Sequence, residues 1–134
     1  MKNCIKILLC CTIVFSLSAC AATSKTPDFK KVYNEILSAD ELSDKCVALS
    51  KDSKSLVVDT NPNNDKNQSR GEAVQNMRVL LKVNELLGLP DALIDKIGST
   101  RELDGQQVNI YGEITITWSY HPDYGLKVIY EKKS

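Results

Sequence analysis

The sequence predicts an α+β domain in which an antiparallel sheet of about five strands carries two to four helices packed on one face. Three observations lead to this prediction. Apolar residues recur with helical spacing between residues 71 and 97. Residues 113–120 alternate strictly between polar and apolar side chains, which is typical of a half-buried antiparallel strand. Short apolar runs bounded by turn-forming residues supply the remaining strands.

Three segments have the spacing and the end signals of helices. The first covers residues 28–37, and a polar turn or a short helix follows it. Ser69 and Glu72 have the spacing of a capping box before a helix over residues 71–87, and Gly88 lies just past its end. Pro90 can begin a further helix that stops at Gly98. The side chains expected to face the core are Phe29, Val32, Tyr33, Ile36 and Leu37, then Val74, Met77, Leu80, Leu81, Val83 and Leu87, and finally Leu93, Ile94 and Ile97.

The strands are predicted around two hairpins. Residues 46–49 and 56–59 are apolar runs on either side of a polar turn, and residues 60–68 are expected to form an exposed loop. A second meander follows the Asp104-Gly105 turn signal. Its inward side chains are expected to be Ile114, Ile116, Trp118 and Tyr120 on one strand and Leu126, Val128 and Tyr130 on the next.

The first residues have the order of a secretory signal peptide: basic residues, an apolar run and then small residues. Leu17-Ser18-Ala19-Cys20 resembles the lipobox of bacterial lipoproteins, in which a branched residue stands three places before the cysteine and small residues lie between. The resemblance implies lipid attachment to the Cys20 thiol and cleavage before it. Residues 1–19 would then be the lipoprotein signal peptide, residues 20–27 a lipidated tether, and residues 28–134 a single domain.

This resemblance implies a lipid anchor on the extracytoplasmic face of the cell membrane. The alternative is an uncleaved transmembrane helix, but the apolar run is shorter than the roughly 20 residues that a spanning helix needs. A tether of this length keeps the domain close to the lipid headgroups. Whether the envelope has one membrane or two stays open.

The charge balance excludes a class of partners. The chain has 17 basic and 17 acidic residues, and loss of Lys2 and Lys6 with the signal leaves 15 against 17, a net charge of −2. Without a basic run, we expect no binding to nucleic acid. Attraction to anionic lipid is likewise not expected to drive membrane binding.

The cysteine and histidine content limits the chemistry. Once the signal is removed and Cys20 carries lipid, Cys46 is alone, so no internal disulfide is expected. We interpret Cys46 as a small apolar residue on a strand, with an intermolecular disulfide left open. One histidine and one thiol cannot build a structural zinc site, and no cofactor is expected. A calcium site within residues 61–65 lacks the ligand spacing of an EF-hand.

Two groups of residues remain as candidate sites. Cys46 and His121 form the only Cys–His pair available for catalysis, and Asp123 could orient the imidazole. Phosphate-binding glycine loops and the G-x-S-x-G motif are absent from the sequence. Tyr111, His121, Asp123 and Tyr124 lie at turns and form a candidate binding surface.

A second resemblance covers most of the mature chain. Asp59-Thr60-Asn61-Pro62, Leu86-Leu87-Gly88-Leu89-Pro90, residues 100–106 and residues 118–126 are similar to segments of a group of small, uncharacterised bacterial lipoproteins. This group supplies no activity to transfer.

We therefore expect a membrane-anchored extracytoplasmic lipoprotein whose monomeric domain binds an envelope or secreted protein, or a small ligand, and is not an enzyme. The alternatives are a Cys-dependent hydrolase or thiol enzyme that uses Cys46 and His121, and an inhibitor of a secreted enzyme.

Overall fold

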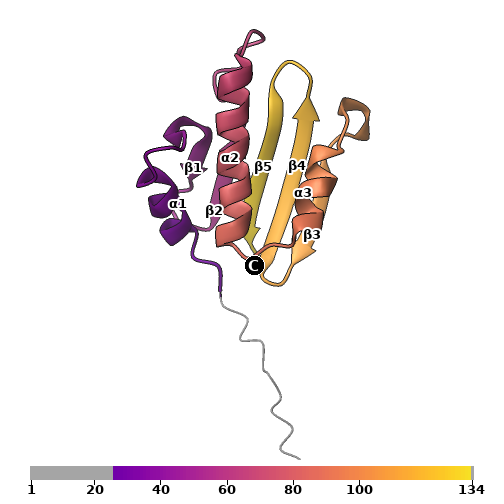
Figure 1. The fold of residues 1–134 in the computed structure, drawn as a ribbon. Helices are drawn as coiled ribbons and strands as arrows, with labels where there is room; N and C mark the ends of the chain where they lie inside the picture. The colour runs from indigo at the N-terminus through magenta and orange to yellow at the C-terminus, as the bar shows by residue number, and fades with distance from the viewer. Residues whose placement is uncertain (1–25, 134) are drawn as a thin grey trace, which may run out of the picture.

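The computed structural model describes residues 26–133, in which a helix and two strands are followed by two helices and then by three strands (Figure 1). The helices are α1 (Phe29–Leu37), α2 (Arg70–Leu86) and α3 (Asp91–Gly98), with short 3₁₀ helices η1 (Asp44–Cys46) and η2 (Glu102–Asp104). The strands are β1 (Val47–Leu49), β2 (Ser55–Asp59), β3 (Gln107–Tyr111), β4 (Ile114–His121) and β5 (Gly125–Lys132).

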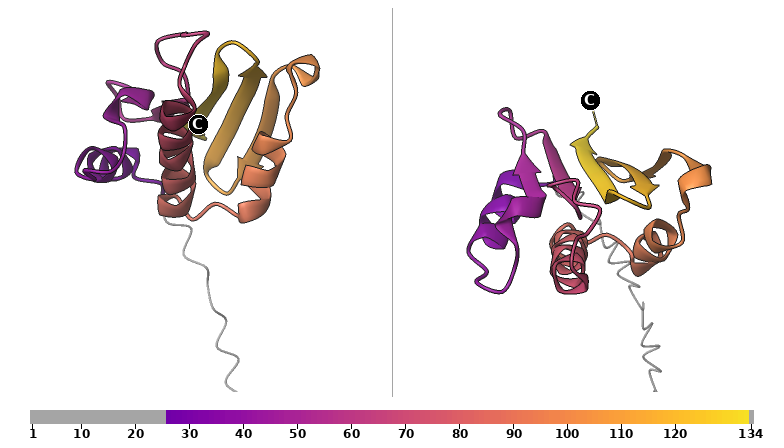
Figure 2. Two further views of the ribbon diagram at one scale, coloured as in Figure 1. Left: turned by 45° about the horizontal axis from the view of Figure 1, so that its top comes forward. Right: turned by 90° about the horizontal axis from the view of Figure 1, so that it is seen from above.

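All five strands belong to one antiparallel sheet with the order β1-β2-β5-β4-β3. Seen from above, α1, α2 and α3 lie on the same side of this sheet (Figure 2). The predicted α+β fold, with helices on one face of a five-stranded antiparallel sheet, is confirmed.

The C-terminal strand joins the two hairpins. β5 lies between β2 and β4, and its Val128 stands opposite Val58 on one side and Trp118 on the other. The hairpins β1–β2 and β3–β4 pair residues that are close in sequence, whereas β5 connects them into a continuous sheet.

The helix ends follow from the residues that the sequence places there. The Asp28 carboxylate accepts a hydrogen bond from the backbone N–H of Lys31 at 3.0 Å and caps α1. The backbone N–H of Glu72 donates to Ser69 Oγ at 3.2 Å, and the backbone N–H of Ser69 donates to the Glu72 carboxylate at 3.1 Å. The predicted capping box of α2 is therefore confirmed. Gly88 follows this helix with φ 66°, a backbone conformation that favours glycine.

A cluster of apolar side chains fills the space between the helices and the sheet. Ile116 on β4 and Val128 on β5 face it, as their alternation predicts. The largest fully buried side chains are Tyr130, Phe29, Ile36, Leu56, Leu80, Leu93, Ile97 and Ile116.

The structure corrects the predicted inward face of α2. Val74 and Leu81 are exposed, whereas Val79 is fully buried. The buried side chains of this helix are Asn76, Val79, Leu80, Val83 and Asn84. Asn84 Nδ2 donates across the core to the Tyr130 hydroxyl at 2.8 Å, whereas the buried Oδ1 of this amide accepts no hydrogen bond from residues 26–133. The apolar pattern alone misplaced the face because two asparagines occupy it.

Two further predictions are corrected at the end of the sheet that bears the β4–β5 turn. The start of the predicted exposed loop is buried at Thr60 and Asn61. Tyr120, predicted to pack in the core beside Trp118, is exposed. The indole N–H of Trp118 donates to Thr100 Oγ1 at 2.8 Å just beyond α3, and Tyr120 lies one inward position further along β4, past this cover.

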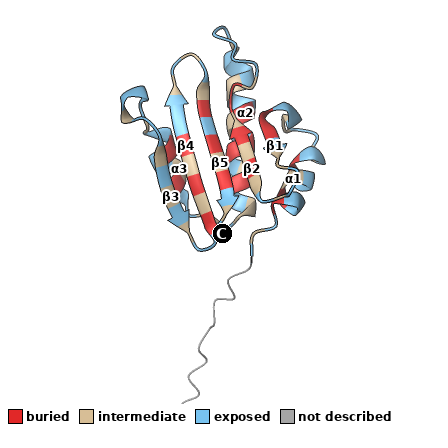
Figure 3. Ribbon diagram, turned by 180° about the vertical axis from the view of Figure 1, so that it is seen from behind, coloured by how far each residue is buried: buried red, intermediate tan, exposed pale blue. Residues whose placement is uncertain are grey.

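The second face of the sheet carries no helix (Figure 3). A row of small and β-branched side chains crosses it: Ala48, Val57, Ile129, Thr117 and Val108. Antiparallel sheets commonly leave one face in contact with water, and this face has that composition.

Candidate functional site

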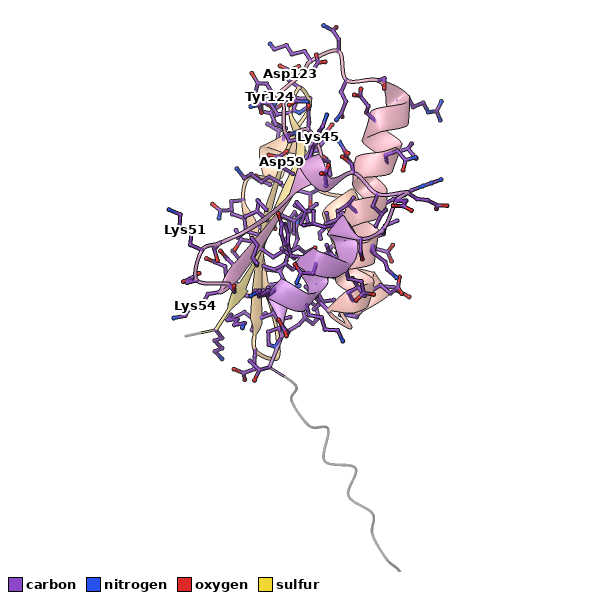
Figure 4. All side chains as sticks on the ribbon, turned by 90° about the vertical axis from the view of Figure 1, so that its left-hand side faces the viewer. Lys45, Lys51, Lys54, Asp59, Asp123 and Tyr124 are labelled. Carbon is purple, nitrogen blue, oxygen red and sulfur yellow. The ribbon has the colours of Figure 1, made fainter. Side chains whose placement is uncertain are left out.

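Three of the four predicted binding residues lie together, and the fourth does not. His121, Asp123 and Tyr124 belong to the β4–β5 turn. Tyr111 ends β3 at the opposite end of the sheet. Figure 4 shows Asp123 and Tyr124 near one end of the molecule, with Lys54 marking the direction of the other end. The predicted surface is therefore two separate places.

The imidazole of His121 is held on three sides. The backbone N–H of Asp123 donates to Nδ1 at 3.1 Å, and the ring stacks on Tyr124 with the ring centroids 4.5 Å apart. Nε2 lies 3.6 Å from a carboxylate oxygen of Glu102. Because Nδ1 accepts a hydrogen bond, the neutral ring carries its proton on Nε2, which faces this carboxylate. The ring thus packs on Tyr124 and, through Nδ1, holds the backbone of the β4–β5 turn.

A buried polar cluster, which we call the loop latch, ties the loop after β2 to the start of β5. Thr60 Oγ1 accepts from the N–H of Leu126 at 2.8 Å and donates to its carbonyl at 3.1 Å. Asn76 Nδ2 donates to the Thr60 carbonyl at 3.0 Å. Asn61 Nδ2 donates to the carbonyl of Asp123 at 3.1 Å. The latch fixes the shape of this end of the domain.

Sequence reasoning did not find the latch. Its two halves, residues 59–62 and residues 118–126, were both similar to segments of other lipoproteins, but no contact between them was predicted. A signal was present in Asp59-Thr60-Asn61-Pro62, because polar residues that end a strand often bond the backbone of a neighbouring turn. Nothing local indicated that the neighbour would be the β4–β5 turn.

Cys46 and His121 do not meet. The two strands that these residues flank, β1 and β4, are separated by β2 and β5, and three strand spacings amount to about 14 Å. Cys46 is only 2% exposed, and its thiol donates to the Ser43 carbonyl at 3.3 Å. Burial raises the pKa of this thiol to about 11. The neutral thiol is a poor nucleophile.

Tyr111 lines a groove at the end of the domain where residue 26 enters, which we call the N-terminal groove. Its volume is about 440 Å³. Apolar side chains from α1, from the α2–α3 connection and from the β3–β4 hairpin line it: Val32, Leu87, Leu89, Tyr111 and Ile114. The charged residues of the lining are Asp28, Lys31, Glu35 and Glu113. Three carboxylates stand against one ammonium group, so the charged part of the lining is net acidic.

In the loop considered for calcium binding, side-chain oxygens accept hydrogen bonds from backbone groups of the same loop. Asn61 Oδ1 accepts from the N–H of Asp65 at 3.1 Å, and Asp65 Oδ1 accepts from the N–H of Asn67 at 2.8 Å. Across residues 26–133, no three or more His, Cys, Asp or Glu side chains gather in a way that could hold a metal ion.

A further surface was missed by the sequence prediction. Val108 and Ile110 of β3 are 59% and 55% exposed, and Leu103 in η2 is 92% exposed. The strand itself was expected, but the position of β3 at the edge of the sheet was not, because strand order depends on where β5 inserts.

Leu17, Ser18, Ala19 and Cys20, together with the rest of residues 1–25, lie outside the described residues. Among residues 26–133, no helix has the length and apolar character needed to span a membrane. No known family model, curated protein or solved structure matches this chain.

Proposed function

We propose that this chain is a lipid-anchored protein-binding module on the extracytoplasmic face of a bacterial cell membrane. The observation that carries the proposal is the string Leu17-Ser18-Ala19-Cys20 behind an apolar run with a basic start. These residues resemble a lipobox at all four positions, and they stand just before a folded domain.

The distance between the proposed anchor and the fold supports a fixed orientation. Five residues lie between Cys20 and Thr26, so the six Cα–Cα steps from one to the other span at most about 22 Å when fully extended. Thr26 lines the N-terminal groove, so this end of the domain would face the bilayer. The β4–β5 turn, at the opposite end of the sheet, would face away from it (Figure 1).

Exposed apolar side chains support a binding role over a purely structural one. Leu103, Val108 and Ile110 are each more than half exposed, and all three lie on η2 and β3 at one side of the sheet. Val108 and Ile110, two residues apart on β3, share one face, and neighbouring exposed apolar side chains on a small domain are typical of an interaction surface. The binding partner is then an envelope or secreted protein.

Metabolic labelling with radioactive palmitate tests the anchor. We expect label on the full chain and complete loss of label in Cys20→Ser. Cys11→Ser, within the apolar run, is the matched control and keeps the label. An unlabelled wild-type protein, or label retained in Cys20→Ser, overturns the proposed anchor.

A further inference from the structure

β3 presents an unpaired edge of the sheet. Its hairpin with β4 closes through a two-residue turn between Tyr111 and Ile114, so Tyr111 and every second residue before it direct their backbone groups toward β4. The N–H and C=O groups of Val108 and Ile110 point away from the sheet. In agreement, the N–H of Ile110 donates to the side-chain oxygen of Asn109 at 3.2 Å and not to β4, and an added strand would replace this local hydrogen bond. No described strand lies beyond β3.

This edge lacks the features that usually prevent pairing. Natural edge strands are blunted by charged residues, by proline, by bulges or by being very short. The five residues Gln107–Tyr111 include no charge and no proline, and they pair with β4 without a bulge. The opposite edge of the sheet, β1, has only three residues. Only β3 offers a partner strand a full-length edge.

The side chains at this edge add an apolar contact. Val108 and Ile110 project to the helix-free face, where Thr117 and Thr115 are their neighbours on β4. They are the most exposed large apolar residues of the sheet. An added strand with apolar residues at alternate positions would continue the row that crosses this face.

A second copy of the chain is a poor occupant. Antiparallel pairing of β3 with its own copy reverses the strand direction, which would place the two Thr26 residues at opposite ends of the joined sheet. Two anchors on one bilayer would not permit this. Five residues from each copy are also far fewer than the roughly 20–30 per side of a stable interface.

We propose that β3 binds an extended segment of another protein by strand addition, with apolar residues of that segment over the helix-free face. Glu102 precedes β3 and Glu113 follows it, and both side chains are exposed. Glu113 forms no ion pair within residues 26–133, and Glu102 approaches only His121. Basic residues at the two ends of the segment would therefore be complementary. This inference rests on the proposed binding function and names its partner class.

The test uses the full-length chain in detergent micelles and the peptide Lys-Thr-Val-Thr-Val-Thr-Lys as the probe. Amide hydrogen exchange is followed by NMR with and without millimolar peptide. We expect the N–H groups of Val108 and Ile110 to exchange at least tenfold more slowly with peptide. The same peptide with methylated backbone nitrogens cannot form the ladder and should give no protection.

Two variants separate this site from others. Ile110→Pro removes one outward N–H and should abolish binding, whereas Ala48→Lys, on the helix-free face but on β1 at the other side of the sheet, should keep the protection. Protection lost in Ala48→Lys, or no protection of Val108 and Ile110 by the unmodified peptide, overturns strand addition. Protection that rises with protein concentration without peptide assigns the edge to a second copy and also overturns it. Palmitate labelling does not depend on any of these results, so the anchor and the strand site fail separately.

Discussion

The thiol of Cys46 shows how burial sets the behaviour of a single residue. Its sulfur lies in the apolar cluster and donates to one backbone carbonyl, and burial, with the nearby charges of Asp59 and Asp44, disfavours its ionised form. A sulfur in this setting contributes packing in place of reactivity. The interpretation of Cys46 as a small apolar residue agrees with this burial, although it lies in η1, directly before β1 and not within the strand.

The pKa of Cys46 predicts a loss of stability at alkaline pH. The folded pKa is raised from 9.0 to about 11, so the folded state holds its proton more tightly than the unfolded chain. The stability contribution is complete below about pH 9 and falls as the pH rises toward 11, by about 3 kcal/mol in the limit. Urea unfolding at pH 8 and pH 10.5 measures the fall.

Cys46→Ala is the control for this prediction, because it lacks the titrating group. Its free energy of unfolding should decline less between the two pH values than that of the wild type. Equal declines would show that Cys46 does not contribute. Tyr130, whose pKa burial also raises, is common to both proteins and cancels in the comparison.

At the scale of elements, the loop latch brings the start of β5 against the loop after β2. Gly125 has φ 74°, and a Cβ added there would lie 2.6 Å from Thr60 Oγ1. Both the backbone conformation and the close approach require glycine at this position. The latch therefore depends on a residue that makes no hydrogen bond of its own to Thr60.

Gly125→Ala should destabilise the domain by about 2–3 kcal/mol, combining the cost of the left-handed backbone with the displaced Thr60 hydrogen bonds. Gly98→Ala is the matched control. Gly98 is helical and has nothing within 4 Å of an added Cβ, so this change should be neutral or slightly stabilising. The midpoints of urea unfolding report both effects, and equal midpoints for the two variants would contradict this account of the latch.

Helices and strands were predicted correctly where residues close together in sequence determine them. The alternation along β4, the capping box at Ser69 and the glycine after α2 each specify a structure through residues close in sequence. The buried face of α2 was partly mispredicted because Asn76 and Asn84 lie on it, and each donates to a group distant in sequence. The separation of Tyr111 from His121 followed from strand direction, and no local signal contains the strand order that makes β3 an edge.

At the scale of the whole molecule, all of the described helices cover one face, so the two faces of the sheet should differ in their energetic importance. Ile116 on β4 is fully buried beneath the helices, whereas Ile129 on the neighbouring β5 is only partly buried on the helix-free face. These residues have the same chemistry and lie on adjacent central strands.

Ile116→Ala should cost about 3–4 kcal/mol of the free energy of unfolding, because it leaves a cavity in the core. Ile129→Ala should cost about 1 kcal/mol or less, since its site is open to water. Chemical denaturation of both variants measures the difference. A similar, large cost at Ile129 would mean that the second face is covered in solution.

Thr26 and Lys133 leave the fold at the same end, close to Glu113: Thr26 shares the N-terminal groove with Glu113, and the backbone N–H of Lys133 donates to the Glu113 carbonyl at 2.9 Å (Figure 1). A short linker between them, with new termini cut into the stretch from Asn63 to Lys66, would give a circular permutant with its fold retained. Its first residue would emerge at the end of the domain that bears the β4–β5 turn. A lipobox placed there would turn this end toward the bilayer and the N-terminal groove away from it.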